Sequence, residues 1–138
     1  MLRFLKNFWP GLLWACVILV LTLLPGNYFP GINSFWELFS PDKLIHIFLF
    51  GVLSYLILQG AEKQYSADDK RYTIILPLLT AMLGGVITEV LQSVLPIGRD
   101  GNMFDTIADF AGCFLGLMIF RMLRKKKNKN LQTKAKNI

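Results

Sequence analysis

The chain contains few of the residues on which soluble or disulfide-stabilised proteins depend. Only 17% of its 138 residues are charged, whereas 54% are hydrophobic. Its two cysteines, Cys16 and Cys113, both fall inside apolar runs, so their spacing provides neither a disulfide framework nor a zinc motif. This composition predicts one small integral membrane domain rather than a soluble one.

Acidic residues are absent from the end of the chain. From Arg121 to Ile138 there are eight lysines and arginines and no aspartate or glutamate, so the net charge of +6 is a local feature. Basic charge beside a membrane span is typical of an orientation signal or of contact with anionic lipid headgroups. No folded surface for reading nucleic acid is visible in the pattern, and we expect no nucleic-acid partner.

Four apolar runs reach or approach the length that crosses a bilayer, which predicts an all-α, polytopic protein with four transmembrane helices. Arg3 and Lys6 precede the first run, but no cleavage site follows it, so we predict a retained helix rather than a signal peptide. The expected helices cover residues 1–24, 41–61, 72–95 and 103–123, separated by a surface loop, a charged linker at 62–71 and a tight turn at 96–102.

These helices divide the chain into a membrane domain, residues 1–123, and a basic tail, residues 124–138, that we predict to be disordered. With both termini in the cytoplasm, thirteen lysines and arginines lie in cytoplasmic segments. Only Lys43 and Arg99 then lie outside. This asymmetry predicts that both termini are cytoplasmic.

Polar residues occur at three of the predicted helix ends. Glu89 and Gln92 are three residues apart, and Asp105 and Asp109 are four apart, so each pair shares a helix face. In the predicted topology these ends and the start of the second helix, with His46, are all extracytoplasmic. At a rise of about 1.5 Å per residue, His46, Glu89 and Asp109 lie at a common depth. The candidate polar site is therefore Asp42, Lys43, His46, Glu89, Gln92, Arg99, Asp105 and Asp109.

Small residues continue the same two faces. Ala81 and Gly85 lie on the face of Glu89, and Gly112 and Gly116 lie on the face of Asp109. We therefore predict that the third and fourth helices pack along this stripe. The glycines expected to serve helix packing are Gly84, Gly85, Gly112 and Gly116.

Two interpretations of the polar residues remain open from the sequence. In one, they form a structural salt-bridge network in which Arg99 neutralises the acids and Asp105 caps a helix. In the other, they form a site for an envelope component, because His46, Glu89 and Asp109 could perform acid–base chemistry or hold a divalent cation. No serine or cysteine nucleophile pairs obviously with His46, which favours binding or modulation and leaves an enzyme as the alternative. The pattern identifies no cofactor.

The motifs D-K-L-I-H-I-F-L-F-G and E-V-L-Q-S-V-L-P-I-G-R-D-G-N-M-F-D-T-I-A-D-F-A-G-C-F-L-G resemble the VanZ-like family of small bacterial membrane proteins. The resemblance covers about Thr22 to Gly116. It implies a four-helix protein of the bacterial cytoplasmic membrane. The namesake of the family is associated with resistance to the glycopeptide teicoplanin, so the resemblance also implies a cell-wall precursor, a lipid or a lipoglycopeptide as partner.

Overall fold

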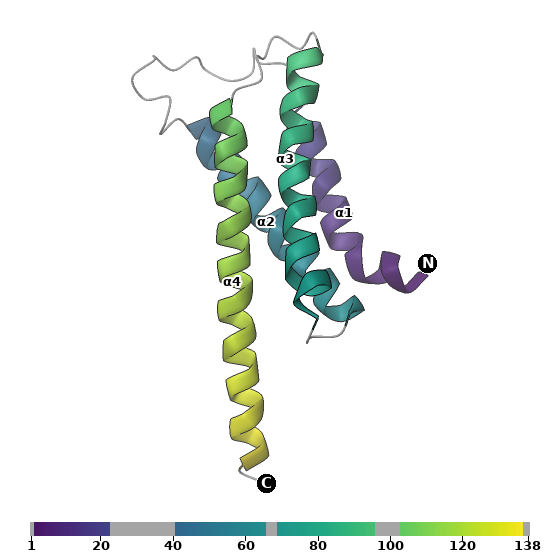
Figure 1. Cartoon of the computed structure of the whole chain (residues 1–138), viewed down its shortest axis with the longest axis vertical. Helices are drawn as coiled ribbons and strands as arrows, with labels where there is room; N and C mark the ends of the chain where they lie inside the picture. Colours follow the sequence, from purple (N-terminus) through teal and green to yellow (C-terminus); the bar gives the residue numbers. More distant parts are fainter. Residues whose placement is uncertain (1, 23–40, 66–68, 96–102, 137–138) are drawn as a thin grey trace.

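The computed structural model describes residues 2–22, 41–65, 69–95 and 103–136, and these residues are almost entirely helical. Figure 1 shows helices α1 (Leu2–Thr22), α2 (Pro41–Gln64), α3 (Leu76–Val94) and α4 (Met103–Lys136). A short π-helix, η3 (Arg71–Ile75), leads directly into α3. Proline at the first position of α2 confirms the predicted start of that helix, since proline needs no hydrogen-bond donor there.

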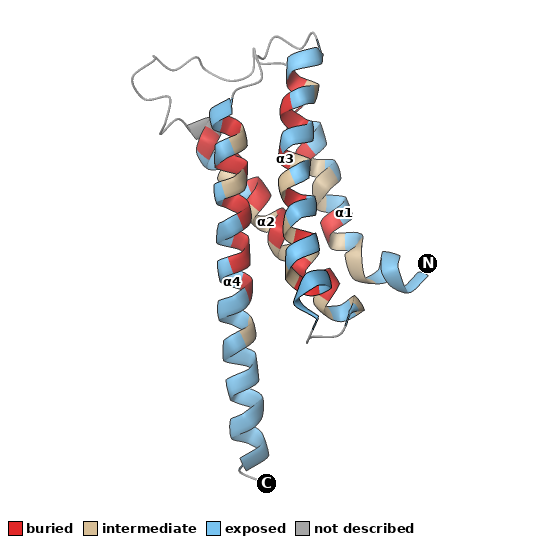
Figure 2. Cartoon of the chain, viewed as in Figure 1, coloured by how far each residue is buried: buried red, intermediate tan, exposed pale blue. Residues whose placement is uncertain are grey.

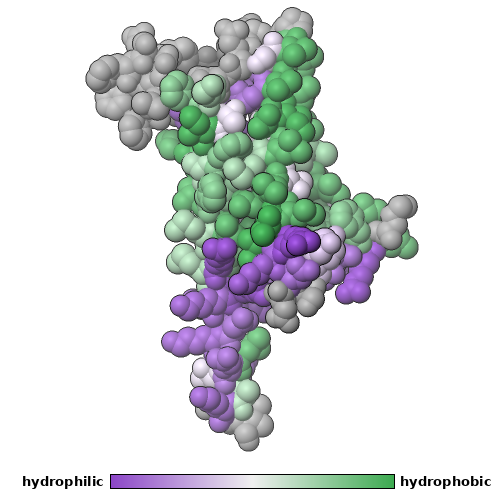
Figure 3. All heavy atoms as spheres, viewed as in Figure 1, coloured by the Kyte–Doolittle hydropathy of each residue, from purple (hydrophilic) through white to green (hydrophobic). Residues whose placement is uncertain are grey.

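All four helices are long and apolar enough to cross a membrane. Large apolar side chains point outward, with Val94 74% exposed and Met118 59% exposed. Figure 3 shows the apolar surface covering the upper part of the molecule, whereas hydrophilic side chains cover the lower part of α4. A surface of this kind is unfavourable in water and favourable in lipid, so the fold is that of a multi-pass membrane protein.

The helices run alternately in opposite directions, and the first and last described residues lie toward the same end of the bundle (Figure 1). The ends of α1 and α3 therefore lie at the same end as the beginnings of α2 and α4. This topology brings together residues that are 63 and 70 positions apart in the sequence.

Helix α2 packs against every other helix, and most extensively against α4. A Cβ atom at Gly112 would collide with the carbonyl oxygen of Ile47, and one at Gly116 would collide with that of Gly51. The backbones of α2 and α4 are therefore in direct contact, as is common where small residues replace the hydrophobic driving force that lipid removes. The predicted packing of α3 on α4 is found at Gly85, which contacts Asp109, but Gly112 and Gly116 contact α2 rather than α3.

The remaining glycines differ in how closely they are packed. A Cβ at Gly60 would lie 2.8 Å from Phe8 of α1, a close contact that the sequence analysis missed. At Gly84 a Cβ would meet only side chains of α2 at ordinary distances, Phe50 at 3.7 Å and Leu53 at 4.0 Å. Gly84 therefore faces α2, but without the close backbone approach of the glycines of α4.

Two helix boundaries differ from the prediction. Helix α2 continues through Glu62 and Lys63, and the Glu62 carboxylate lies 2.9 Å from Nε of Arg124 on α4. The linker that follows α2 is therefore shorter than the predicted linker at 62–71. At the start of the third span, Pro77 has no amide hydrogen to continue a regular helical ladder, and the chain forms the π-helical turn of η3 in front of it.

The basic tail also differs from the prediction, because α4 continues as an exposed helix to Lys136 (Figure 2). Lysine, arginine, glutamine and alanine favour helices, and a helix already formed in the membrane needs no new nucleus to continue. The expected surface loop and the tight turn at 96–102 lie outside the described residues.

Candidate polar site between three helices

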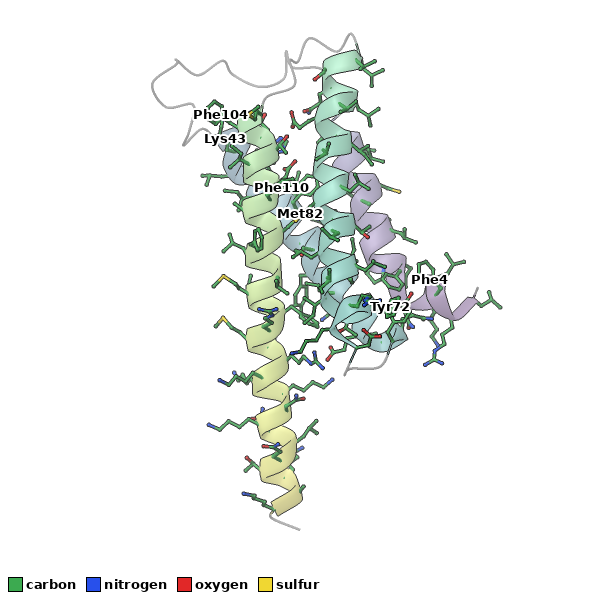
Figure 4. The ribbon with its side chains drawn as sticks, in the orientation of Figure 1. Phe4, Lys43, Tyr72, Met82, Phe104 and Phe110 are labelled. Atoms are coloured by element: carbon green, nitrogen blue, oxygen red, sulfur yellow. The ribbon has the colours of Figure 1, made fainter. Side chains whose placement is uncertain are left out.

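Three helix ends supply the polar residues of the site. His46 lies in the second turn of α2, Glu89 and Gln92 lie in the last two turns of α3, and Asp105 and Asp109 lie in the first two turns of α4. All five side chains are buried. The up-and-down topology places these turns at one end of the bundle, where Figure 4 labels Lys43 and Phe104.

His46 and Asp109 form the closest contact. Nδ1 of His46 lies 2.8 Å from Oδ1 of Asp109, and the two residues are 2% and 0% exposed. An ionised carboxylate only accepts hydrogen bonds, so with Asp109 ionised the proton lies on Nδ1 of His46 and is donated to Asp109. This contact fixes the orientation of the imidazole ring and joins α2 to α4.

Glu89 of α3 completes a group of three. One potential ligand atom from each of His46, Glu89 and Asp109 lies within 4.8 Å of the other two. Two carboxylates at this spacing inside a bundle are expensive, because burying charge costs free energy unless other charges or donors compensate it. The arrangement suits proton transfer, recognition of a polar group or coordination of a cation.

Gly85 makes the room that Asp109 occupies. A Cβ at Gly85 would lie 2.9 Å from both Cβ and Oδ2 of Asp109, closer than real side chains approach. The small residue predicted for helix packing therefore admits a carboxylate from the neighbouring helix. The contact between α3 and α4 at this level is made by the polar group itself.

Lys43 and Asp105 form a second pair at the same end of the bundle. Nζ of Lys43 lies 3.6 Å from Oδ1 of Asp105, and both side chains are about nine-tenths buried. The lysine also lies over the ring of Phe104, 6.0 Å from its centre. Asp105 stands in the first turn of α4, where a negative charge is favourable, so this pair has a structural explanation.

Gln92 is directed to α1 rather than to the acids. Its Nε2 donates to the carbonyl oxygen of Thr22 over 3.0 Å, which satisfies a carbonyl in the last turn of α1. Thr22, which is buried, was not predicted, although a threonine at the end of an apolar run is a signal that the sequence shows. The side chains of Asp42 and Arg99 lie outside the described residues, so their membership of the site stays a prediction.

The fold and these contacts define a multi-pass helical membrane protein with a buried polar cluster at one end. The sequence profile of the VanZ/LLP1 family matches residues 12–124, which is most of the chain. The protein therefore belongs to the VanZ/LLP1 family, as its motifs indicated. Comparisons with curated proteins and with solved structures found no match.

Proposed function

We propose that this VanZ/LLP1 protein binds the polar part of an envelope amphiphile in the outer leaflet of the bacterial cytoplasmic membrane. The observation that carries the proposal is the convergence of His46, Glu89 and Asp109 from three helices. A structural lock does not need these groups, because the glycine contacts already hold α2 against α4. Buried ion pairs contribute little net stability, so this cluster is better explained by a ligand than by a purely structural role.

The charge distribution supports a site in the outer leaflet. Placing both termini in the cytoplasm puts the basic segments there, and it puts the polar end of the bundle on the outside. Candidate ligands at that surface are a lipid-linked cell-wall precursor, another lipid or a lipoglycopeptide. Binding of any of them at the site would alter the interaction of such an antibiotic with the cell surface, so we propose lowered sensitivity to teicoplanin as the cellular effect.

A second candidate is an enzyme that acts on the same class of substrate. The 2.8 Å contact between His46 and Asp109, with Glu89 beside it, is the arrangement expected of a general acid–base group. Mass spectrometry of envelope lipids incubated with the purified protein separates the two candidates. A product that accumulates with time in the wild type and not in Glu89→Gln supports the enzyme, and unchanged lipids support binding alone.

The proposal is tested by the minimum inhibitory concentration of teicoplanin in a sensitive strain that expresses the chain. His46→Gln and Glu89→Gln remove groups of the cluster, and Glu62→Gln is the matched control because its carboxylate lies at the opposite end of the bundle. We expect the wild type and Glu62→Gln to raise the inhibitory concentration and the two cluster variants to lose this effect at equal abundance.

Full protection by both cluster variants at wild-type abundance would refute the site. A wild-type chain that leaves the teicoplanin response unchanged would refute that phenotype. The same variants, in an assay of general envelope stress, then distinguish a ligand site from a purely structural role of these residues.

A further inference from the structure

We infer that His46, Glu89 and Asp109 together bind one divalent transition-metal ion, with zinc as its test ion. The inference deepens the proposed function, because it concerns the same site. Each ligand comes from a different helix, so the ion would join α2, α3 and α4 at their polar ends. One imidazole and two carboxylates form a three-ligand set of the kind that leaves a coordination position for water or a substrate oxygen.

The spacing of the ligand atoms is close to that of a metal site. Bonds from zinc to histidine or carboxylate are about 2.0–2.2 Å, so bound ligand atoms lie roughly 3–3.5 Å apart. Here one atom from each residue lies within 4.8 Å of the others. Side-chain rotations that move these ligand atoms by about 1 Å are enough to bring them to bonding distance from one ion.

The contact between His46 and Asp109 is slightly shorter than the separation of two ligands bound to one ion. Their atoms are 2.8 Å apart and share a proton. An ion bonded to both atoms takes the place of that proton, since metal ligands bind in their deprotonated form.

Charge and ligand type favour a transition metal. Two ionised carboxylates and a neutral imidazole are the deprotonated forms that bind metals, and their formal charge matches that of a divalent ion. Calcium takes about six to eight oxygen ligands, and magnesium keeps most of its water, whereas a mixed nitrogen and oxygen set suits zinc and its neighbours.

The helix contacts hold the three ligands in place. Gly85 admits Asp109 against α3, and Gly112 brings the backbone of α4 onto that of α2 at Ile47, next to His46. Ligands on closely packed helices are positioned more accurately than ligands on loops.

The test uses the full chain, purified in a mild detergent without a polyhistidine tag, stripped with a chelator and dialysed against zinc chloride. Bound zinc is measured after gel filtration by mass spectrometry of the metal, and affinity by competition with a chromophoric chelator. We expect one zinc per chain in the wild type and in Glu62→Gln, and affinity at least tenfold weaker in His46→Gln and Glu89→Gln.

A wild-type chain without stoichiometric zinc overturns the inference, and so do cluster variants that bind zinc like the wild type. If a cluster variant does not purify as a monodisperse species, Gly85→Ala and Gly84→Ala replace it. Alanine at 85 crowds Asp109 and should weaken zinc binding, whereas alanine at 84 has room and should not. Equal affinity in this pair also overturns the inference.

The two proposals fail separately. A chain that binds no zinc but loses teicoplanin protection in His46→Gln retains the proposed function without the metal. A chain that binds zinc at these residues but never alters antibiotic or stress responses retains the metal site without the proposed function.

Discussion

Replacing Gly85 by alanine places a methyl group 2.9 Å from both Cβ and Oδ2 of Asp109. The carboxylate oxygen can rotate away, but Cβ of Asp109 is fixed to the backbone of α4. Either the side chain turns and lengthens its 2.8 Å contact with His46, or α3 moves outward from α4. In both cases the cluster of His46, Glu89 and Asp109 is disturbed by a change that removes no polar group.

The adjacent Gly84 provides the matched control, because its Cβ would make only ordinary contacts, 3.7 Å from Phe50 and 4.0 Å from Leu53. Both substitutions gain about 0.5–1 kcal/mol of helix propensity, and this common gain cancels in their difference. Overpacking a well-packed site costs about 1–3 kcal/mol. We therefore expect Gly85→Ala to be about 1–3 kcal/mol less stable than Gly84→Ala.

The assay is unfolding of both variants in mild detergent titrated with sodium dodecyl sulfate, followed by circular dichroism. Teicoplanin response in cells is measured for the same pair, and we expect only Gly85→Ala to lose it. Equal stability and equal cellular response in Gly85→Ala and Gly84→Ala would refute the inference that the small size of Gly85 makes room for Asp109.

Three further predictions follow from other contacts. Lys43→Met and Asp105→Asn should each lower the free energy of unfolding by about 3–5 kcal/mol, because a buried charge loses its partner. The double variant should lose less than either single variant. Additive losses in the same unfolding assay would show that the pair is not coupled. A chain ending at Leu123 loses the exposed helical tail and the partly exposed pair of Glu62 with Arg124. Its free energy of unfolding should therefore change by no more than about 1 kcal/mol. A larger loss would mean that the tail packs on the bundle. Single cysteines at Asn33 and Asn102, in a chain without Cys16 and Cys113, should react with an impermeant thiol reagent on whole cells, and one at Ser66 should not; labelling at Ser66 would contradict the cytoplasmic termini.

The helices and the depth of the polar residues could be predicted from the sequence because both depend on local pattern. Apolar length sets the spans, and the three- and four-residue spacings set the buried faces of Glu89 and Asp109. Alternating helices then bring those ends to the end of the bundle where His46 stands. The structure brings the three side chains together, and their role as a site stays our proposal.

The choice of helix partners could not be predicted in the same way. Gly112 and Gly116 mark a face that permits close approach, but a small-residue face does not specify which helix approaches it. The partner, α2, carries one glycine at the contact, Gly51, which gives little signal beside the long apolar run around it.

The pairing of side chains could not be predicted from the sequence either. Lys43 and Gln92 lie at the predicted depth, yet each is directed to a neighbour, Asp105 or Thr22, rather than to the cluster. Depth follows from helix length, whereas pairing follows from the rotation of each helix about its own axis. The helical tail was missed because its polar, basic composition predicted disorder and did not show its continuity with α4.

An experimental structure of the full chain, purified with native membrane lipid and in the presence of zinc, tests the central claim most directly. Our account predicts non-protein density between His46, Glu89 and Asp109, from an ion, a lipid headgroup or both. A site closed by protein side chains alone, with Arg99 seated between the two carboxylates, would contradict it and establish a structural network in its place.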